Sequence, residues 1–319
     1  MQNNDKQSLI IIAGPTAVGK TALSIELAKS INASIISADS MQVYKHMDIG
    51  SAKVTKDEMQ GIKHYLIDVL EPEEEFNIAT FKQFAKNDIE YIKNDGKIPI
   101  IAGGTGFYIQ ALLYDINFDD DANKSDEIRD RLENLITTKG NEFVHNMLRK
   151  VDEKAADEIH PNNVKRVIRA LEYHYLTGEK ISKHNETERI KESPYNFKYF
   201  VINEDRALLY KNIDKRVDIM IENGLVDEVK ALKERGLTKD NISMQGLGYK
   251  EILSYLNNDI SLEEAVYIIK RDTRHFAKRQ LTWFKREKDV IWINKEDFSF
   301  DNNKIIEFMK EQLKGAGII

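Results

Sequence analysis

The chain has 319 residues, of which 41% are hydrophobic and 31% are charged, and its formal net charge is −6. This composition is ordinary for a globular protein and excludes the disordered, collagen-like and membrane-spanning classes. Because the chain has no cysteine and no apolar run long enough for a membrane span or a signal peptide, we expect a cytoplasmic protein without disulfides, thiolate metal sites or a membrane partner.

The first predicted element is a buried strand over 8–13, which leads into the segment GPTAVGKT at 14–21 and then a helix over 21–30. The segment matches the phosphate-loop pattern G-x-x-x-x-G-K-[ST], in which backbone N–H groups and the lysine surround a diphosphate and the hydroxyl meets Mg²⁺. The candidate diphosphate-binding residues are Gly14, Pro15, Thr16, Ala17, Val18, Gly19, Lys20 and Thr21, with Thr21 as the Mg²⁺ ligand. Most chains with this loop act on ATP or GTP, so nucleotide binding is the default interpretation.

Three further buried strands are predicted at 33–36, 64–70 and 97–104, and a helix over 77–93 has Asn77 as a candidate N-cap. Strands that alternate with helices indicate a parallel sheet covered on both faces. We therefore expect an α/β fold with a P-loop NTPase-like parallel sheet flanked by helices. The acidic run at 71–76 is interpreted as a solvated turn, and Asp68 as a structural residue.

Polar residues follow two of these strands, where ligands of open parallel sheets bind. Asp39 comes after the strand at 33–36, so it is a candidate base or metal-linked carboxylate beside the phosphate loop. An equally good interpretation is that Asp39 and Ser40 only cap a turn. Thr105 follows Gly103 and Gly104, which allow a close backbone approach, and its hydroxyl could reach an anionic group.

The pattern changes near Tyr114, where strand signals give way to charged amphipathic helices. The strand pattern resumes at 199–202, long helices extend to about 288, and a last strand at 289–294 precedes a closing helix. We therefore predict a sheet domain formed by 1–115 and 199–319 around an all-helical insertion at 116–198.

The helix over 270–288 is strongly basic, with eight Lys or Arg residues against two acidic ones. Arg271, Arg274, Lys278 and Lys285 fall within one stripe roughly 60° wide, and Phe276, Trp283 and Phe284 lie on the far side. We expect the aromatic face to pack inward and the basic face to contact a nucleic-acid backbone, with a simple solvated face as the alternative. Arg166 and Arg169 form a smaller basic face in the insertion.

Together these stretches resemble the tRNA dimethylallyltransferases, also called tRNA isopentenyltransferases. The resemblance rests on seven segments in the family's order: GPTAVGKT, SADSMQVY, IAGGTGFY, HPNNVKRVIRALE, RVDIMIENGLVDEV, QGLGYKE and TRHFAKRQLTWF. They extend from Gly14 to Phe284, nearly the whole chain.

The resemblance implies transfer of a dimethylallyl group from dimethylallyl diphosphate to the N6 amine of the tRNA adenosine 3′ of the anticodon (position 37), with release of diphosphate. Asp39 would then be the general base, Thr105 and Arg216 would stabilise the leaving diphosphate, and Mg²⁺ would be the cofactor. The implied partner is the anticodon stem-loop of tRNA, and we expect a monomer. The residues that match tRNA-contacting segments, together with the basic stripe, are Asp39, Ser40, Met41, Gln42, Thr105, Lys165, Arg166, Arg169, Gln245, Gly248, Tyr249, Lys250, Arg271, Arg274 and Lys278.

Three other functions compete with this one. A phosphate-loop kinase for a small metabolite would explain 14–21 but leave the basic stripe and the insertion without a role. A related isopentenyltransferase that modifies free adenine nucleotides would not need the basic helix. A nucleic-acid-dependent NTPase would need a carboxylate pair for hydrolysis, such as an apolar strand that ends in Asp-Glu, and the sequence contains none.

Overall fold

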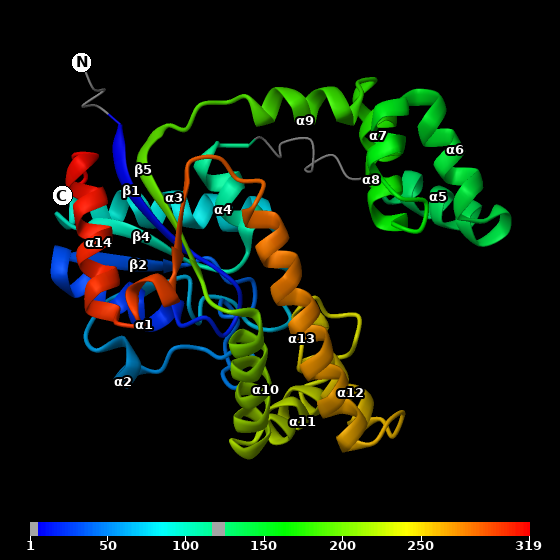
Figure 1. Cartoon of the computed structure of the whole chain (residues 1–319). Coiled ribbons are helices and arrows are strands. Elements are labelled where there is room, and N and C mark those ends of the chain that lie inside the picture. The colour runs from blue at the N-terminus through cyan, green and yellow to red at the C-terminus, as the bar shows by residue number, and fades with distance from the viewer. Residues whose placement is uncertain (1–5, 117–124) are drawn as a thin grey trace. The chain divides into compact units, whose positions relative to one another are not determined.

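The computed structural model describes residues 6–116 and 125–319, which form two compact units (Figure 1). The sheet unit comprises Met1–Leu112 and Pro194–Ile319, and the helical unit comprises Leu113–Ser193. These limits lie a few residues before the boundaries expected from the sequence, and 117–124 of the expected insertion fall outside the described residues. Within the described part of the chain, no helix has the length and apolar character needed to cross a membrane.

The sheet has six strands in the order β3-β2-β4-β1-β5-β6, and every neighbouring pair is parallel. The strands are β1 (Gln7–Ala13), β2 (Ala33–Ser37), β3 (His64–Tyr65), β4 (Ile98–Gly103), β5 (Tyr195–Asn203) and β6 (Val290–Asn294). Ala13 at the end of β1 pairs with Gly103 on one side and Val201 on the other. The predicted α/β class is confirmed, and the loops after β1, β2 and β4 meet at one edge of the sheet.

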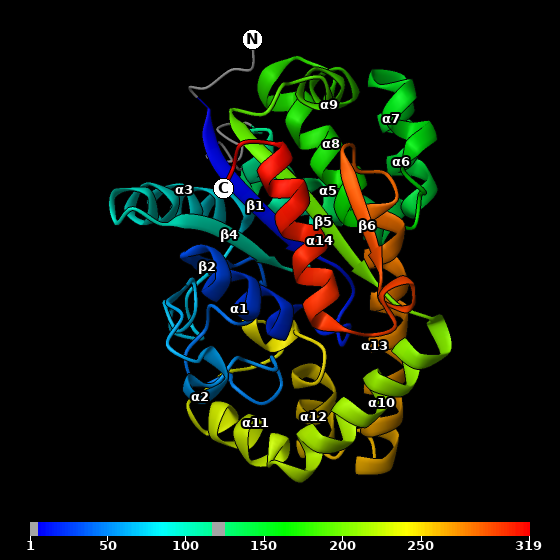
Figure 2. The ribbon, with the colours of Figure 1, turned by 60° about the vertical axis from the view of Figure 1, so that its left-hand side comes forward.

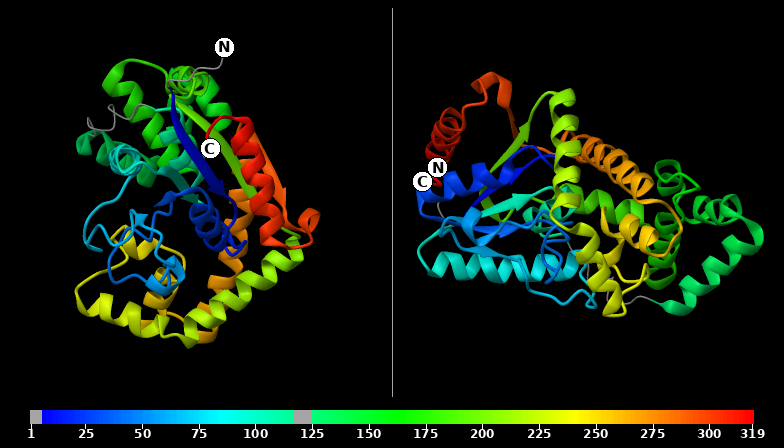
Figure 3. Two further views of the ribbon diagram at one scale, coloured as in Figure 1. Left: turned by 90° about the vertical axis from the view of Figure 1, so that its left-hand side faces the viewer. Right: turned by 90° about the horizontal axis from the view of Figure 1, so that it is seen from below.

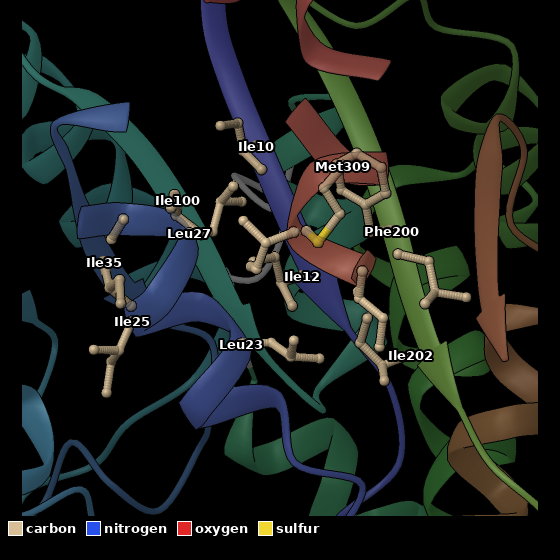
Figure 4. Close-up of a cluster of buried hydrophobic side chains, with 14 of the residues drawn as sticks. Ile10, Ile12, Leu23, Ile25, Leu27, Ile35, Ile100, Phe200, Ile202 and Met309 are labelled. Carbon is tan, nitrogen blue, oxygen red and sulfur yellow. The ribbon is translucent and has the colours of Figure 1, made fainter. Parts of the chain in front are cut away.

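The core lies on both faces of this sheet because its central strands are apolar on both sides. On one face α1 (Lys20–Ile31) and α14 (Asn302–Gly315) cover the strands. Figure 4 shows Leu23 and Leu27 of α1 and Met309 of α14 among Ile10, Ile12, Ile100 and Phe200 of the strands. Leu9 and Ile11 point to the opposite face, since side chains alternate along a strand. There α3 (Ile78–Asn94) covers the sheet, so that α3 and α14 lie on opposite sides (Figure 3).

The predicted strand at 64–70 is wrong beyond its first two residues. Leu66 and Asp68 have φ values of 59° and 55°, which a strand cannot contain. The backbone of residues 68–70 instead bonds to Gln42 and Val43, outside the sheet. Asp68 forms an ion pair with Lys53 at 2.6 Å, so its predicted structural role is confirmed. The strand expected at 199–202 is longer, because it begins at Tyr195.

Other local expectations hold. Asn77 caps α3 by accepting a hydrogen bond from the Thr80 N–H. Within the acidic run, Glu71 and Glu73 pair with Arg235 at the surface. Two short helices not expected from the sequence, α2 (Lys56–Met59) and α4 (Gly106–Leu113), follow the 39–55 segment and β4.

Four helices of the sheet unit lie between β5 and β6 in the chain. They are α10 (Arg206–Glu222), α11 (Leu225–Glu234), α12 (Tyr249–Leu256) and α13 (Leu262–Phe284). Figure 2 shows α10, α11 and α12 beyond the carboxyl ends of the central strands, while α13 returns toward β6. The carboxyl edge of the sheet is therefore surrounded by helices that bring the segments RVDIMIENGLVDEV, QGLGYKE and TRHFAKRQLTWF into one region of the unit.

The described residues of the helical unit form α5 (Asp126–Lys139), α6 (Asn141–Val151), α7 (Glu153–Glu158), α8 (Val164–Thr177) and α9 (Ile181–Arg189). The unit has its own apolar core, which includes Leu132, Val144, Leu148 and Leu171. Its two ends are joined, because the Ser193 hydroxyl donates to the carbonyl oxygen of Leu113 at 2.6 Å.

The end of β4 leaves no room for a side chain at Gly103, where a Cβ atom would lie 2.3 Å from the carbonyl oxygen of Ala38. We expect Gly103→Ala to lower the free energy of unfolding by about 1–3 kcal/mol, because the β2 and β4 ends must separate. Gly315→Ala is the matched control, since a Cβ there meets nothing within 4 Å, and it should be neutral or slightly stabilising. Urea denaturation would compare the two variants, and equal midpoints would contradict the predicted close contact.

Candidate active site

The phosphate loop joins β1 to α1, as the sequence predicts. Gly14 has φ 148°, and a Cβ atom there would lie 2.5 Å from the carbonyl oxygen of Ile202. Gly19 has φ 93° and is the N-cap of α1. The Lys20 ammonium donates to the carbonyl oxygens of Gly14 at 3.0 Å and Pro15 at 2.8 Å, so the loop curves around it. A glycine-rich turn at a helix N-terminus is well suited to bind an anion.

This loop lines a cavity of about 780 Å³ in the sheet unit. The other walls come from the end of β2, residues 48–55, Gly103 and Gly104, one face of α10, and Phe276 and Gln280 of α13. The cavity brings together eight of the predicted site residues: Thr16, Ala17, Gly19, Lys20, Thr21, Asp39, Gln42 and Arg216. Among the described residues that line it, Gly104 is present and the neighbouring Thr105 is not.

Two of the cationic side chains that line the cavity, Lys20 and Arg216, influence each other. Burial, followed by the repulsion of Arg216, lowers the pKa of Lys20 to about 7. Burial likewise lowers the pKa of Arg216, and the nearby Asp39 carboxylate partly offsets this effect. Burial thus disfavours the charged forms of both side chains. A bound anion would stabilise these charged forms, so the cavity favours an anion beside Lys20 and Arg216.

Asp39 is both a turn residue and a cavity residue, so the two interpretations of its sequence position are compatible. Its Oδ1 accepts a hydrogen bond from the Met41 N–H at 2.9 Å. Burial raises the pKa of Asp39, although the N–H groups of Met41 and Gln42 and the charges of Lys20 and Arg216 oppose the shift. A carboxylate with a raised pKa is a stronger base, which suits removal of a proton from a bound substrate.

Gln280 is a positioning residue that the sequence did not reveal. It is 6% exposed, and its amide oxygen accepts from the Thr16 N–H while its amide nitrogen donates to the Gly104 carbonyl oxygen, both at 2.9 Å. It therefore fixes the phosphate loop relative to the loop after β4. Its position three residues after the buried Ala277 is the only signal in the sequence that it points inward.

A second missed network connects the phosphate loop to α10. The carboxylate of Glu204, whose side chain is fully buried, accepts from Lys295 at 3.1 Å and from Asn212 at 2.9 Å. Lys295 also donates to the Val18 carbonyl oxygen at 3.3 Å. Since Asn212 lies one helical turn before Arg216, this network sets the position of α10 against the loop.

The basic stripe of α13 is only partly free. Arg274 is bonded to Asp214 and Arg271 to Asp272, whereas Lys278 is exposed. Lys278 lines a shallow surface hollow with His275, Arg279, Thr282, Trp283 and Arg286. The expected inward aromatic face holds in part: Phe284 is buried and Trp283 packs on Gly106 and Phe107 of α4, whereas Phe276 lines the cavity.

Two other predicted tRNA-contacting positions have internal roles in the structure. Tyr249 is fully buried, and its hydroxyl donates to Glu228 at 2.8 Å. Gly248 is buried at the start of α12, with φ 95°. Their burial replaces the predicted surface contact, because the segment QGLGYKE turns back into the core at these residues.

The remaining predicted contacts lie at or near the surface of their units. Ser40 and Met41 are partly exposed, Gln245 is exposed, and Lys250 is exposed beside Glu251 at 3.4 Å. In the helical unit Lys165 and Arg166 are exposed at the start of α8. Arg169 is half-buried and pairs at 3.4 Å with Glu172, whose side chain is fully buried and also binds Arg129, so it has a structural role and its tRNA contact stays a prediction.

The protein supplies few ligands for a metal ion. Among residues 6–116 and 125–319, no three His, Asp or Glu side chains come together in a way that could hold one. Thr21 is exposed in the cavity. This donor set fits Mg²⁺ only as an ion carried largely by a phosphate ligand and water, with the Thr21 hydroxyl as the protein ligand.

Comparison with known proteins agrees with the resemblance seen in the sequence. The family model described as IPP transferase matches residues 42–287. The match begins after the phosphate loop, so it does not depend on that widespread motif.

Individual relatives cover nearly the whole chain. The tRNA dimethylallyltransferase of Lachnoclostridium phytofermentans is 61% identical over 95% of this chain and 97% of that protein. The structure of the tRNA isopentenylpyrophosphate transferase from Bacillus halodurans has a TM-score of 0.73 and 43% identity, over 98% of each chain. A eukaryotic dimethylallyltransferase described as acting on tRNA has a TM-score of 0.79 and 33% identity, over 92% of this chain and 75% of that one.

The lowered pKa of Lys20 predicts a proton uptake that accompanies anion binding. At pH 8 a lysine with a pKa of about 7 is mostly neutral, and a bound anion restores its charge. Wild type should therefore take up about one proton more per inorganic diphosphate than Lys20→Arg, whose guanidinium stays charged. Titration calorimetry in buffers of different ionisation enthalpy measures this difference, which should vanish near pH 5.5. Equal uptake by the two proteins at pH 8 would show that Lys20 is already charged.

Proposed function

The chain belongs to the IPP transferase family, and on that basis we propose that it transfers the dimethylallyl group of dimethylallyl diphosphate to tRNA. The acceptor is the N6 amine of the adenosine 3′ of the anticodon, and the products are N6-dimethylallyladenosine and diphosphate. The observation that carries the proposal is that the half-buried cations Lys20 and Arg216 line one cavity with the carboxylate of Asp39. This arrangement suits an anionic leaving group next to a proton acceptor. The reaction belongs in the cytoplasm, with its tRNA substrate.

In this reaction the bond between the allylic carbon and the diphosphate oxygen breaks, and a bond from that carbon to N6 forms. Negative charge grows on the departing diphosphate, which Lys20, Arg216 and the N–H groups of the phosphate loop stabilise. The adenine amine is a weak nucleophile because its lone pair is delocalised into the ring. Asp39 accepts the amine proton as the new bond forms, which contributes about 10²- to 10⁴-fold in rate.

Two further groups are assigned to the diphosphate. Thr105 lies directly after Gly104, a lining residue of the cavity, and directly before α4. Its hydroxyl is proposed to bind the leaving group. Thr21 would hold Mg²⁺, which supplies positive charge that neutralises the diphosphate.

The acceptor base must leave its stack to enter the cavity, and this costs less in an anticodon loop than in a duplex. Exposed cations on both units suit the phosphates of the RNA around it. In the sheet unit these are Lys278 and its neighbours in the hollow, and in the helical unit Lys165 and Arg166. A transferase for free adenine nucleotides would have no use for them.

A label-transfer assay without ATP distinguishes the proposed function from the two ATP-dependent alternatives. Label from dimethylallyl diphosphate should reach the anticodon-loop adenosine of unmodified tRNA with Mg²⁺ present and ATP absent. A nucleic-acid-dependent NTPase would show no transfer under these conditions and would release phosphate when ATP and RNA are added together. A small-metabolite kinase would also fail to transfer the label, and its ATP use would not respond to RNA.

Asp39→Asn should reduce turnover at least 10²-fold, because the amide cannot accept the N6 proton. Its affinity for tRNA should stay within about twofold of wild type, since the change leaves the exposed cations intact. Asp227→Asn is the control, because Asp227 is exposed on α11 away from the cavity lining. If Asp39→Asn transfers the dimethylallyl group at the wild-type rate under single-turnover conditions, Asp39 is not the base.

A salt effect is expected from Lys278, which like Lys285 is an exposed cation of the α13 stripe. Lys278→Gln should weaken tRNA binding and reduce the slope of log affinity against log salt by about 0.7–0.9 if Lys278 makes one phosphate contact. Lys314→Gln removes one charge from another exposed site, at the end of α14, and should leave the slope unchanged. Fluorescence anisotropy across a salt series would measure both. An unchanged slope for Lys278→Gln would make the stripe a solvated face only.

A further inference from the structure

Residues 48–52, here called the 48–52 loop, are bound by one carboxylate from α11. Glu228 Oε2 accepts from the N–H groups of Asp48 and Ile49, both at 2.8 Å, and its Oε1 accepts from the Gly50 N–H at 3.0 Å. Three successive backbone N–H groups thus point at one side chain, as they do in the anion-binding concavities of other proteins. The position of this loop therefore depends on where α11 places Glu228.

A second side chain fixes the same loop. The Tyr249 hydroxyl donates to Glu228 Oε1 at 2.8 Å, so the carboxylate has four donors. The Tyr249 ring packs against Gly50, where a Cβ atom would lie 2.6 Å from ring carbons. The sequence segments RVDIMIENGLVDEV and QGLGYKE thus converge on the loop, and neither Glu228 nor Tyr249 lines the cavity.

The other side of the loop holds Gln42. The Gln42 amide nitrogen donates to the carbonyl oxygens of Ala52 at 3.2 Å and Ser51 at 3.5 Å, and its amide oxygen accepts from the Ser37 hydroxyl at 3.0 Å. These bonds give the half-buried Gln42 side chain a structural role at the wall of the cavity, and its predicted tRNA contact stays a prediction. The loop therefore restrains the position of Gln42.

The turn that contains Gln42 also carries Asp39. The carboxylate of Asp39 accepts from the Met41 N–H, and the Gln42 N–H supports it as well. We propose that Glu228 is a positioning residue for Asp39, acting through the 48–52 loop and Gln42; this inference rests on the proposed function, in which Asp39 is the base. The route runs from the Glu228 carboxylate to the loop N–H groups, from the loop carbonyls to Gln42, and from Gln42 to the turn that holds Asp39.

The 48–52 loop forms part of the wall of the catalytic cavity. Asp48, Ile49, Ser51 and Ala52 line the cavity that contains Asp39 and Lys20. A base must stay within hydrogen-bond distance of the proton that it accepts, and a displacement of about 1 Å can reduce the rate 10²-fold. Loss of the loop restraint should therefore affect the chemical step more than substrate binding.

The test compares Glu228→Gln with Asp227→Asn, which removes the same charge from the preceding residue of α11. Asp227 is exposed, and none of the loop hydrogen bonds described above involves it. Glu228→Gln replaces an acceptor oxygen with an amide that faces N–H donors, so the loop should loosen. We expect the rate of single-turnover transfer to fall at least tenfold, with the KM values for tRNA and dimethylallyl diphosphate within about threefold of wild type. Tyr249→Phe, which keeps the ring against Gly50, should give a smaller decrease.

Hydrogen exchange supplies a readout that does not depend on activity. In Glu228→Gln the amides of 48–50 and those of Met41 and Gln42 should exchange faster, while amides of the strands stay as in wild type. Faster exchange at 48–50 alone would overturn the proposal, because the loop would then move without the Asp39 turn. Faster exchange throughout the sheet unit would also overturn it, since Glu228 would then serve general stability.

The two hypotheses fail in different ways. If wild type transfers the label and Glu228→Gln transfers it equally fast, the positioning role of Glu228 is wrong and the proposed function stands. If wild type transfers nothing, the proposed function is wrong, and the exchange at Met41 and Gln42 still decides whether Glu228 holds that turn.

Discussion

Parallel pairing of β1 with β4 and β5 is the constraint on which the site depends. Because the three strands run in the same direction and Ala13 pairs with both Gly103 and Val201, their loops emerge at one edge. The phosphate loop, the Asp39 turn and the loop at Gly104 then meet although they lie far apart in the chain. A shift in this register would separate the phosphate loop from Asp39, so the apolar packing of α1 and α14 on the sheet also maintains the cavity.

Three polar side chains maintain this arrangement. Gln280 joins two loops, Glu204 joins the phosphate loop to α10, and Glu228 holds the 48–52 loop. Each is a polar side chain that binds backbone groups or a neighbouring charge, so its hydrogen bonds specify one loop position in a way that apolar packing cannot. Within this frame Arg216 disfavours the charged form of Lys20, and the proposed diphosphate would offset that repulsion.

Local sequence patterns were enough to predict much of the fold, including β1, the phosphate loop, α1, β2 and β4. They failed at 64–70, because apolar residues alone do not reveal the positive φ values of Leu66 and Asp68. In the site, Lys20, Asp39 and Arg216 were found through motifs, but Gln280 was not, since its partners lie 176 and 264 residues away. The same limit applies to Arg274, whose partner Asp214 lies on another helix. A prediction from the charge of one helical face therefore overestimated how many of its cations are free of ion pairs.

The hydrogen bond between Ser193 and Leu113 closes the helical unit at its point of entry and exit. The chain leaves the sheet unit after α4 and returns at β5 through ends that lie side by side, and the unit between them has its own core. Insertions or replacements there need not alter the strand register or the phosphate loop. The region that carries Lys165 and Arg166 can thus be exchanged in evolution as a module, and the proposed RNA contacts there can diversify while the cavity of the sheet unit stays unchanged.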